Sequence, residues 1–291
     1  MRSKPIRRDI TIEYDDAGVR KTIFTLPPTH APEKPSVYAF SLPKAGSVLL
    51  DSILSALSSV EGLTFVSIMG KFFELGLAEK NVPAETSRIF LNHGYCFGGF
   101  RSFPQRFEIA NLSHCKAILL VRDPRDMIVS HYFSTRSSHP NPGRALSTSM
   151  KSMPLREQAQ TLTVDEYAIE RTKFYGRLLR GYMSALDQNL ETIRVYRYED
   201  VIFKKPEWIA DMCNYFGWSV PEATIRKIAS KNDIRPRAEK ESKHVRQVSP
   251  GDYLRKLRPE TIAQLDQLLQ KELSYFGYHQ TAGVEELVRP S

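Results

Sequence analysis

Cysteine is scarce in this sequence. The 291 residues include only three cysteines, Cys96, Cys115 and Cys213, which are widely spaced and form no Cys-x-x-Cys pair. Disulfide frameworks need paired cysteines, and structural zinc sites need closely spaced ligands. We therefore expect neither, and a reducing cytoplasm is the expected compartment.

Long apolar runs are also missing. No stretch approaches the roughly 18 uninterrupted apolar residues that indicate a transmembrane helix. The polar, basic residues 1–9 contain no apolar segment of the kind found in a signal peptide. No internal repeat is evident. A globular protein with no transmembrane segment is the expectation.

Positive charge is in excess. Lys and Arg total 41 against 33 Asp and Glu, which gives a net charge of +8 and favours an anionic partner. The composition, 41% hydrophobic and 25% charged, suits one large domain. Alternating residues on either side of a turn at 15–18 predict a hairpin. We expect residues 1–35 to form this hairpin and a proline-rich connector, and residues 36–291 to form a single α/β domain.

Short apolar runs alternate with segments of helical periodicity. This pattern predicts an α/β fold, in which a central parallel sheet of about four to five strands is flanked by helices. The strands are expected at 37–42, 63–68, 88–91, 117–121 and 194–198. Helices are expected after the first of these strands, at 71–79, after a capping box at Thr163, and near Pro206, Pro221 and Pro259. Residues 134–160 and 231–258 have little regular pattern and are predicted to be loops.

The turn Lys44-Ala45-Gly46-Ser47 lies between the first of these strands and an amphipathic helix. A helix start carries unpaired N–H groups and partial positive charge, so this turn suits an anion such as a phosphate. An ordinary connection with a surface lysine would have the same pattern. The turn is not a Walker A loop, because Lys44 precedes its only glycine. This order of residues disfavours a nucleoside triphosphatase.

A second motif, Arg122-Asp123-Pro124-Arg125-Asp126, follows the most apolar strand. Asp123, Pro124 and Asp126 suit the first turn of a helix and need no other explanation. Arg122 does not share that explanation, because the carboxyl end of a central parallel strand faces the crevice where α/β sheets bind ligands. Ser130, eight positions after Arg122, would add a hydroxyl donor for the same anion.

Together these residues resemble the sulfotransferase family that uses 3′-phosphoadenosine 5′-phosphosulfate (PAPS), which has a P-loop-like three-layer sandwich. Residues 43–48 resemble its Pro-Lys-Ser-Gly-Thr-Thr loop for the 5′-phosphosulfate. Arg122 and Ser130 fit its 3′-phosphate motif, residues 198–200 its Tyr-Glu-Asp, and residues 246–253 its Arg-Lys-Gly-x-x-Gly-Asp-Trp segment. The resemblance implies a donor site formed by Lys44, Ala45, Gly46, Ser47, Val48, Arg122, Ser130, Tyr198, Arg246 and Gln247.

The sequence departs from the family pattern at several of these positions. Ala45 replaces a Ser or Thr, and Val48 replaces a Thr whose hydroxyl would donate a hydrogen bond. Leu49 stands where many members have a tryptophan, and Gln247 and Val248 replace Lys-Gly. We expect a bacterial-type or otherwise divergent member.

The resemblance implies transfer of the sulfuryl group from PAPS to a hydroxyl of an acceptor. Lys44 would neutralise the leaving phosphate, and no metal is expected because lysine and amides hold that phosphate. His93 lies between the two nucleotide motifs, where the family has its catalytic histidine, and is the predicted general base. A hydrogen-bonded loop histidine is the alternative. His131 and His244 are reserve candidates.

The acceptor is expected to be a small molecule, lipid or carbohydrate that is selected by loops such as 67–87 and 134–160. Several aromatic residues would either line an apolar acceptor pocket or pack in the core: Phe72, Phe73, Phe97, Phe100, Phe103 and Tyr132. Two other functions stay open, a small-molecule kinase and a non-catalytic module that binds polyanions. The basic residues between 231 and 258 are interleaved with acidic ones and include a single aromatic residue, Tyr253. This composition argues against a nucleic-acid partner.

Overall fold

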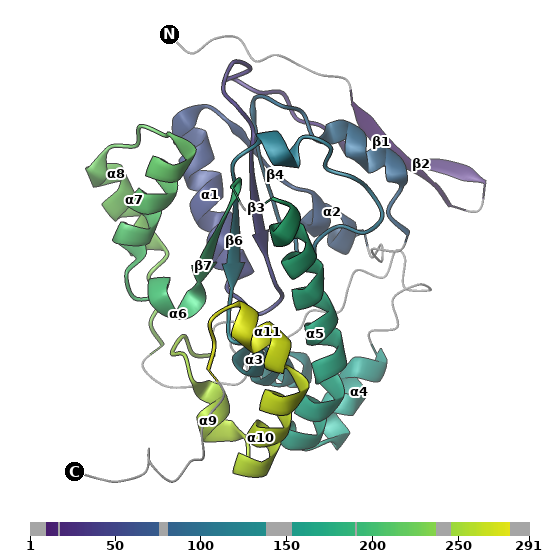
Figure 1. The fold of residues 1–291 in the computed structure, drawn as a ribbon. Helices are drawn as coiled ribbons and strands as arrows, with labels where there is room; N and C mark the ends of the chain where they lie inside the picture. The colour runs from purple at the N-terminus through teal and green to yellow at the C-terminus, as the bar shows by residue number, and fades with distance from the viewer. Residues whose placement is uncertain are drawn as a thin grey trace.

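A five-stranded parallel sheet forms the centre of the protein, with strand order β4-β5-β3-β6-β7 (Figure 1). The computed structural model describes residues 10–16, 18–75, 81–137, 153–189, 191–236 and 246–279. The strands are β3 (Val37–Ser41), β4 (Thr64–Ser67), β5 (Tyr95–Gly98), β6 (Ala117–Val121) and β7 (Ile193–Arg197). The predicted α/β fold with a parallel central sheet is confirmed.

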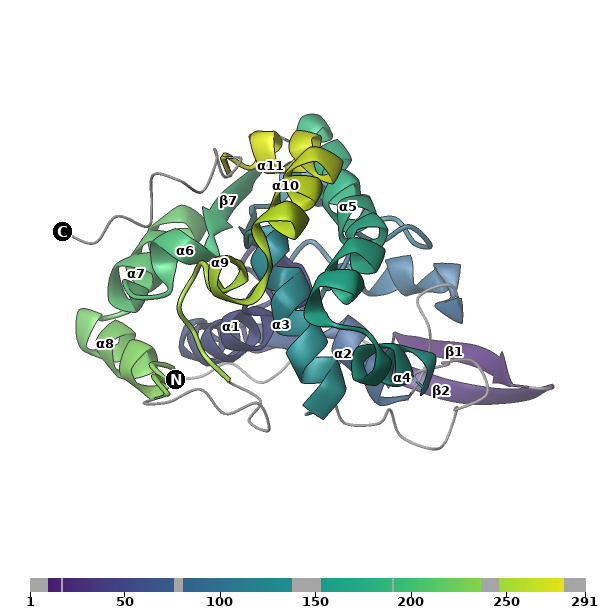
Figure 2. The ribbon, with the colours of Figure 1, turned by 90° about the horizontal axis from the view of Figure 1, so that it is seen from below.

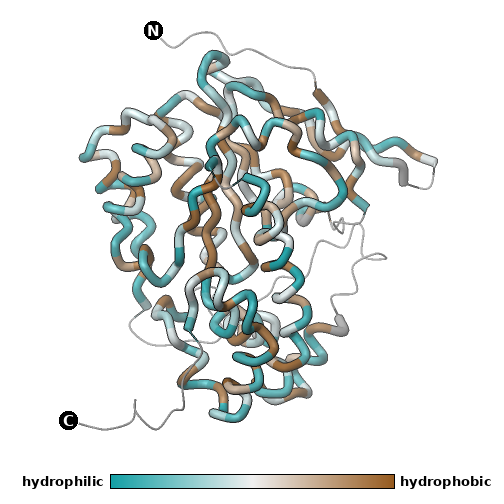
Figure 3. The backbone as a smooth tube through the Cα atoms, viewed as in Figure 1, coloured by the Kyte–Doolittle hydropathy of each residue, from teal (hydrophilic) through white to brown (hydrophobic). Residues whose placement is uncertain are grey.

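Helices cover both faces of the sheet and make three layers (Figures 1 and 2). One face is packed by α1 (Ser47–Glu61), α7 (Lys205–Phe216) and α8 (Glu222–Lys231). The other is packed by α2 (Ile68–Glu74), α3 (Pro124–Ser137) and α5 (Val164–Gln188). The central strands are apolar along their length, as a sheet covered on both faces requires (Figure 3).

Five shorter helices complete the described part of the chain. α4 (Met153–Thr161) packs beside α3, and α6 (Tyr198–Val201) directly follows β7. α9 (Asp252–Lys256) contacts α3, while α10 (Pro259–Leu268) and α11 (Gln270–Tyr275) pack on α5. The C-terminal part of the described chain therefore returns to the helices that follow β6.

Local sequence explains where the longer helices begin and end. Thr163 and Glu166 form the predicted capping box at the start of α5, each accepting a hydrogen bond from the other's backbone N–H. At the end of α7, Gly217 adopts φ 77°, which favours glycine. The helices predicted at Pro206, Pro221 and Pro259 are confirmed as α7, α8 and α10.

The strand predicted at 88–91 is wrong. Residues Ala84–Ile89 form a 3₁₀ helix, η2, and the strand between β4 and β3 is formed by Tyr95–Gly98. Both segments contain short apolar runs, and periodicity alone does not say which of them pairs. The tetrapeptide Tyr95–Gly98 is buried, and its residues pair in register with Thr64–Ser67. It therefore forms the strand between β4 and β3.

The loops predicted at 134–160 and 231–258 are partly helical. α3 continues to Ser137, α4 occupies Met153–Thr161, and α9 forms inside the second segment. Residues 138–152 and 237–245, which include the reserve candidate His244, lie outside the described residues. The helix predicted at 71–79 begins earlier, at Ile68.

The N-terminal hairpin is present as β1 (Thr11–Asp16) and β2 (Val19–Thr25), which pair antiparallel. Ile12 and Ile23 are buried and belong to the same apolar core as α3 and α5. The division of the chain after residue 35 stays a prediction. Within the described ranges, none of the helices combines the length and apolar character that crossing a bilayer requires.

Candidate anion-binding site

The turn between β3 and α1 is strained and tight. Lys44 has φ 68°, which is unusual for a residue with a side chain, and Gly46 has φ 89° at the N-cap of α1. A Cβ atom on Gly46 would lie 3.1 Å from the ring of Tyr198. Only glycine therefore brings this turn so close to the Tyr198 ring, and backbone strain at Lys44 is a feature often found at functional sites.

Arg122 joins this turn from the neighbouring strand β6. Its Nη1 donates to the carbonyl of Lys44 at 3.2 Å, and its Nη2 donates to Asp126 Oδ2 at 3.1 Å. The guanidinium carbon lies 4.5 Å from the centre of the Tyr198 ring. Arg122 is only 5% exposed, yet its Nε is buried without a hydrogen-bond partner. A buried donor left over in this way suits an acceptor that comes from outside the chain.

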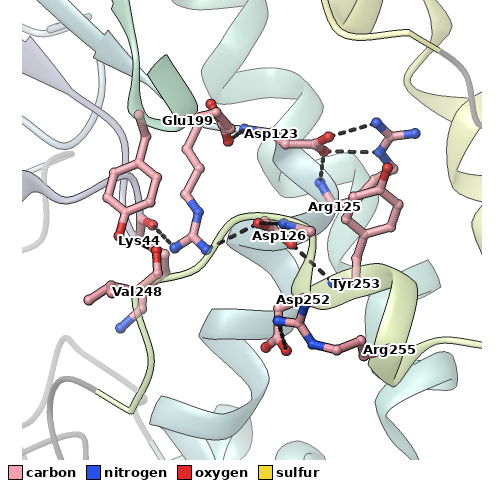
Figure 4. Close-up of polar contacts among 12 residues, drawn as sticks. Lys44, Asp123, Arg125, Asp126, Glu199, Val248, Asp252, Tyr253 and Arg255 are labelled. Atoms are coloured by element: carbon pink, nitrogen blue, oxygen red, sulfur yellow. Dashed lines mark hydrogen bonds and ion pairs between the residues drawn. The ribbon is translucent and has the colours of Figure 1, made fainter. Parts of the chain in front are cut away.

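Asp126 connects α3 to the C-terminal segment. Its carboxylate also accepts from the backbone N–H groups of Gly251 and Tyr253, at 2.9 and 3.0 Å. Figure 4 shows Asp126 between Lys44 and Tyr253, with these contacts drawn. In addition, the Tyr198 hydroxyl donates to the Val248 carbonyl at 2.9 Å. Residues 246–253, which begin with the predicted donor-site residues Arg246 and Gln247 and are called the closing segment below, are thus fixed beside the Lys44 turn.

Arg246 brings a third cation into the same place. It forms an ion pair with Asp252, and its guanidinium carbon lies 4.4 Å from the centre of the Phe133 ring. Arg246 is 8% exposed. Ser130 is partly exposed and lies one turn after Asp126 in α3, so it shares that side of the helix. Ser130 and Arg122, both described in the structure, form no hydrogen bond with each other.

Burial has the largest effect on the pKa values in this cluster. Burial, together with the charges of Arg122 and Arg246, lowers the pKa of Lys44 to about 8. Burial raises the pKa of Tyr198 to about 12, although Arg122 opposes that rise. Burial also acts to raise the pKa of Asp252, but Arg246 holds it below its usual value. Burial is thus the largest cause of the lowered Lys44 pKa, and the two arginines add to it.

A second ion-pair network supports the first turn of α3. The buried Arg125 pairs with Asp123 at 2.6 Å and with Asp266 of α10 at 2.5 Å. Asp123 Oδ1 also accepts from the Arg125 backbone N–H at 2.9 Å, as the predicted helix cap requires. The Asp123 backbone N–H in turn donates to Glu199 at 2.9 Å. The segment after β6 is therefore held by contacts from α6, α9 and α10.

His93 does not join this cluster. Its side chain is exposed and precedes β5, and the residue forms a bridge with Pro35 just before β3. Because β3 and β5 are parallel, His93 lies at the amino edge of the sheet and Lys44 at the carboxyl edge. The five residues of β3 span roughly 16 Å. The sequence analysis predicted a strand at 88–91, which would have placed His93 after a strand, at the carboxyl edge. These residues form no strand, and His93 instead precedes β5 at the amino edge.

The aromatic candidates for an acceptor pocket are mostly core. Phe72, Phe97 and Phe100 have no exposed surface and Tyr132 is 4% exposed. Phe100, for example, packs with its ring centre 4.8 Å from that of Phe40. Phe103 is partly buried against the same cluster, while the side chain of Phe73 lies outside the described part.

An open groove lies elsewhere, along the edge strand β7 and α11. It has a volume of about 620 Å³ and is lined by residues that include Val195, Arg197 and Tyr275. None of the predicted site residues lines it. This groove is therefore separate from the cation cluster. In the described part of the chain, no group of three or more His, Cys, Asp or Glu side chains is placed to hold a metal ion.

Comparisons with known proteins agree with this fold. The family model described as "Sulfotransferase domain" matches residues 101–277, so the chain belongs to the sulfotransferase domain family. A protein of Solibacter usitatus (strain Ellin6076) described as "Nucleotide-binding protein" is 27% identical over 162 residues, which cover 53% of this chain and 49% of that protein. The chain thus matches about half the length of this relative. The predicted family resemblance is confirmed.

Solved structures support the fold. Mouse sulfotransferase SULT7A1, complexed with PAP, superposes with a TM-score of 0.56 at 15% identity, over 82% of this chain and 84% of that one. Retinol dehydratase in a complex with retinol and PAP gives a TM-score of 0.52 at 14% identity, over 83% and 82% of the two chains. At such identities the likeness concerns the fold.

Sequence reasoning missed the acidic half of the site. The sequence analysis explains Asp126 as a helix-start residue. It assigns no role to Asp252, which lies in the 246–253 segment. The structure gives each a buried arginine partner. Their neighbours in sequence do not reveal this, because the contacts of Asp126 with Gly251 and Tyr253 cross 125 and 127 residues.

Proposed function

We propose that this protein transfers the sulfuryl group of PAPS to a hydroxyl of a small-molecule acceptor. The observation that carries the proposal is the convergence of Lys44, Arg122 and Arg246, with the Nε of Arg122 buried and unpaired. A ligand with phosphates at two places would satisfy such a cluster. Membership of the sulfotransferase domain family supports this choice of anion.

The cluster divides into two halves. Lys44 and the N–H groups of Gly46, Ser47 and Val48 would hold the 5′-phosphosulfate at the start of α1. The Ala45 N–H donates to the Leu42 carbonyl at 3.2 Å, so Ala45 would shape the turn. Arg122, Ser130 and Arg246 would hold the 3′-phosphate beside β6. Tyr198 supports both halves, since its ring contacts Arg122 and Gly46 while its hydroxyl holds Val248. Gln247, next to Arg246, lies in the same closing segment.

PAPS supplies the sulfuryl group and a phosphate leaving group. As the bond between sulfur and the bridging oxygen breaks, negative charge grows on that oxygen, and a charged Lys44 stabilises it. The fixed turn and the docked C-terminal segment hold the reacting atoms in place, which reduces the entropic cost of reaching the transition state. These residues provide position and charge and form no covalent bond with the substrate.

The acceptor is proposed to be a hydroxyl-bearing small molecule. Retinol dehydratase, which has a related fold, was solved with compounds of that size, retinol in one structure and androsterone in another, each with PAP. The exposed position of His93 does not support its predicted role as general base. We therefore propose that the proton acceptor comes from another element.

Nucleotide selectivity tests the proposal directly. We expect isothermal titration to show that PAP binds at least about tenfold more tightly than AMP, because AMP leaves a buried arginine without its phosphate. Replacement Arg122→Ala should remove most of this preference. Replacement Arg226→Ala is the matched control, since Arg226 forms an exposed pair with Glu222 on α8. Equal binding of PAP and AMP by the wild-type protein would refute the proposal, and preferential binding of ATP with Mg²⁺ would favour a kinase.

A further inference from the structure

The two residues at the carboxyl end of β5 are glycines and carry no side chains. β5 ends at Gly98 and is followed by Gly99, which has φ 78°. A Cβ atom on Gly98 would lie 2.7 Å from the Phe65 ring, and one on Gly99 would lie 2.1 Å from Ser67 Oγ. Contacts this short exclude larger residues at both positions. Any reactive group at this end of β5 must therefore come from another element.

Asp51 of α1 supplies such a group. Its Oδ1 accepts from the Gly99 backbone N–H at 3.1 Å, and its Oδ2 accepts from Nη2 of Arg101 at 3.0 Å. The Asp51 side chain is 18% exposed and that of Arg101 is 33% exposed, so a small molecule can reach the pair. Each carboxylate oxygen keeps a second lone pair. The carboxylate is thus fixed in direction and still able to accept a proton.

The order of the strands places Asp51 on the side of the Lys44 turn where the hydroxyl that accepts the sulfuryl group would lie. Arg122 ends β6 on one side of β3, and the Asp51–Gly99 contact is at the end of β5 on the other. A donor with its 3′-phosphate near Arg122 and its 5′-phosphate at Lys44 would direct its sulfuryl group away from β6. In-line attack brings the nucleophile from the side opposite the leaving oxygen. That side is the carboxyl end of β5.

Histidines do not occupy this position in the described part of the chain. His93 and His114 precede β5 and β6, at the amino edge of the sheet. His131 lies on α3, where its Nδ1 and the Tyr167 hydroxyl are 2.8 Å apart. Neither His30 nor His279 lies in the segment that directly follows β5. A carboxylate on α1 is the group that the fold places there.

We propose that Asp51 is the proton acceptor of the transfer reaction, and that Arg101 positions it. This inference rests on the proposed sulfuryl transfer. The acceptor oxygen attacks sulfur while the bond from sulfur to the bridging oxygen breaks. The hydroxyl proton passes to a carboxylate oxygen of Asp51, and the electron pair of the broken bond stays on the leaving phosphate, whose charge Lys44 offsets. The products are the sulfated acceptor and PAP.

Replacement Asp51→Asn tests this role, with Arg101→Gln as the matched control. The asparagine can still accept from Gly99 N–H, and both changes remove the same ion pair. The assay follows sulfate or sulfated product released from ³⁵S-labelled PAPS, with water alone and with a phenol, a sterol and a sugar each added as acceptor. We expect kcat to fall at least a hundredfold in Asp51→Asn and less than about tenfold in Arg101→Gln. PAP affinity and Tm should stay at wild-type values in both variants.

Chemical rescue separates proton transfer from a structural effect. In Asp51→Ala, added sodium formate should restore part of the turnover, and it should leave Arg101→Gln unchanged. Equal kcat in wild type and Asp51→Asn, or equal losses in Asp51→Asn and Arg101→Gln without formate rescue, would overturn the role of Asp51 alone. A wild-type protein that binds PAP but never consumes PAPS above the rate in buffer would instead refute the proposed transfer, and the role of Asp51 with it.

Discussion

Lys44 is expected to couple donor binding to proton uptake. In the free protein, burial and two neighbouring arginines lower its pKa to about 8 from the usual 10.5. Two bound phosphates would reverse this effect, because opposite charge favours the protonated amine. Lys44 should therefore gain a proton when PAP binds at pH 8 and above. Below pH 7 it is already charged, so this uptake disappears.

The size of the effect follows from that pKa. With a value of about 8, the charged fraction of Lys44 in the free protein falls from about nine-tenths at pH 7 to about one-tenth at pH 9. If bound PAP restores the usual pKa, affinity should fall about tenfold between these two pH values. Uptake at pH 8 should be about half a proton per PAP bound. Phosphate monoesters titrate near pH 6, so they contribute little in this window.

Calorimetry measures both quantities. Titration of PAP in buffers of different ionisation enthalpy gives the number of protons taken up, and titration across pH 7 to 9 gives the change in affinity. Lys44→Arg is the control, because its guanidinium stays charged and the pH dependence should vanish. An affinity that is flat from pH 7 to 9 in the wild type would refute the reasoning. The same slope in wild type and Lys44→Arg would assign the proton to another group.

Three further predictions concern the parts around Lys44. Asp126→Asn leaves the buried Arg122 without its carboxylate and should cost about 3 kcal/mol of unfolding free energy, or roughly 6 °C in Tm. Calorimetric scanning would measure this loss beside Glu222→Gln, an exposed control that should leave Tm unchanged. Tyr198→Phe removes the hydrogen bond to the Val248 carbonyl, worth about 1 kcal/mol, so stopped-flow should show PAP leaving about fivefold faster; unchanged release would contradict a closing role for that segment. His93→Ala should change kcat less than about twofold in the PAPS turnover assay, because an exposed side chain at the opposite edge of the sheet is lost; a hundredfold fall would restore His93 as the base.

The sequence predicted the features that depend on local chemistry. The capping box at Thr163, the apolar strand 117–121 and the helices that begin at prolines each have a cause within a few residues, and each is confirmed. The strand-turn-helix at Lys44 is of the same kind. The charge of this turn and the burial of Arg122 depend on packing, yet their residues were identifiable because both follow strands of a parallel sheet.

Features that depend on pairing could not be predicted in this way. The segment around Ile89 and the strand Tyr95–Gly98 have similar apolar character, and only the fit against Thr64–Ser67 decides between them. The wrong choice moved His93 to the wrong edge of the sheet. Asp51 gave no signal, because an aspartate in an amphipathic helix is usually a solvated residue and its contact with Gly99 crosses 48 positions.

The long-range contacts of α3 have a consequence for synthesis of the protein. Arg125 meets Asp266 across 141 residues, and Asp126 meets Tyr253 across 127. Ribosomes add about 5 to 20 residues each second, so both charged side chains wait on the order of ten seconds for these partners. During that interval the nascent chain has the Lys44 turn and Arg122, but the closing segment, which contains Arg246, is not yet made. The anion site is therefore completed only after residues 246–253 have been synthesised.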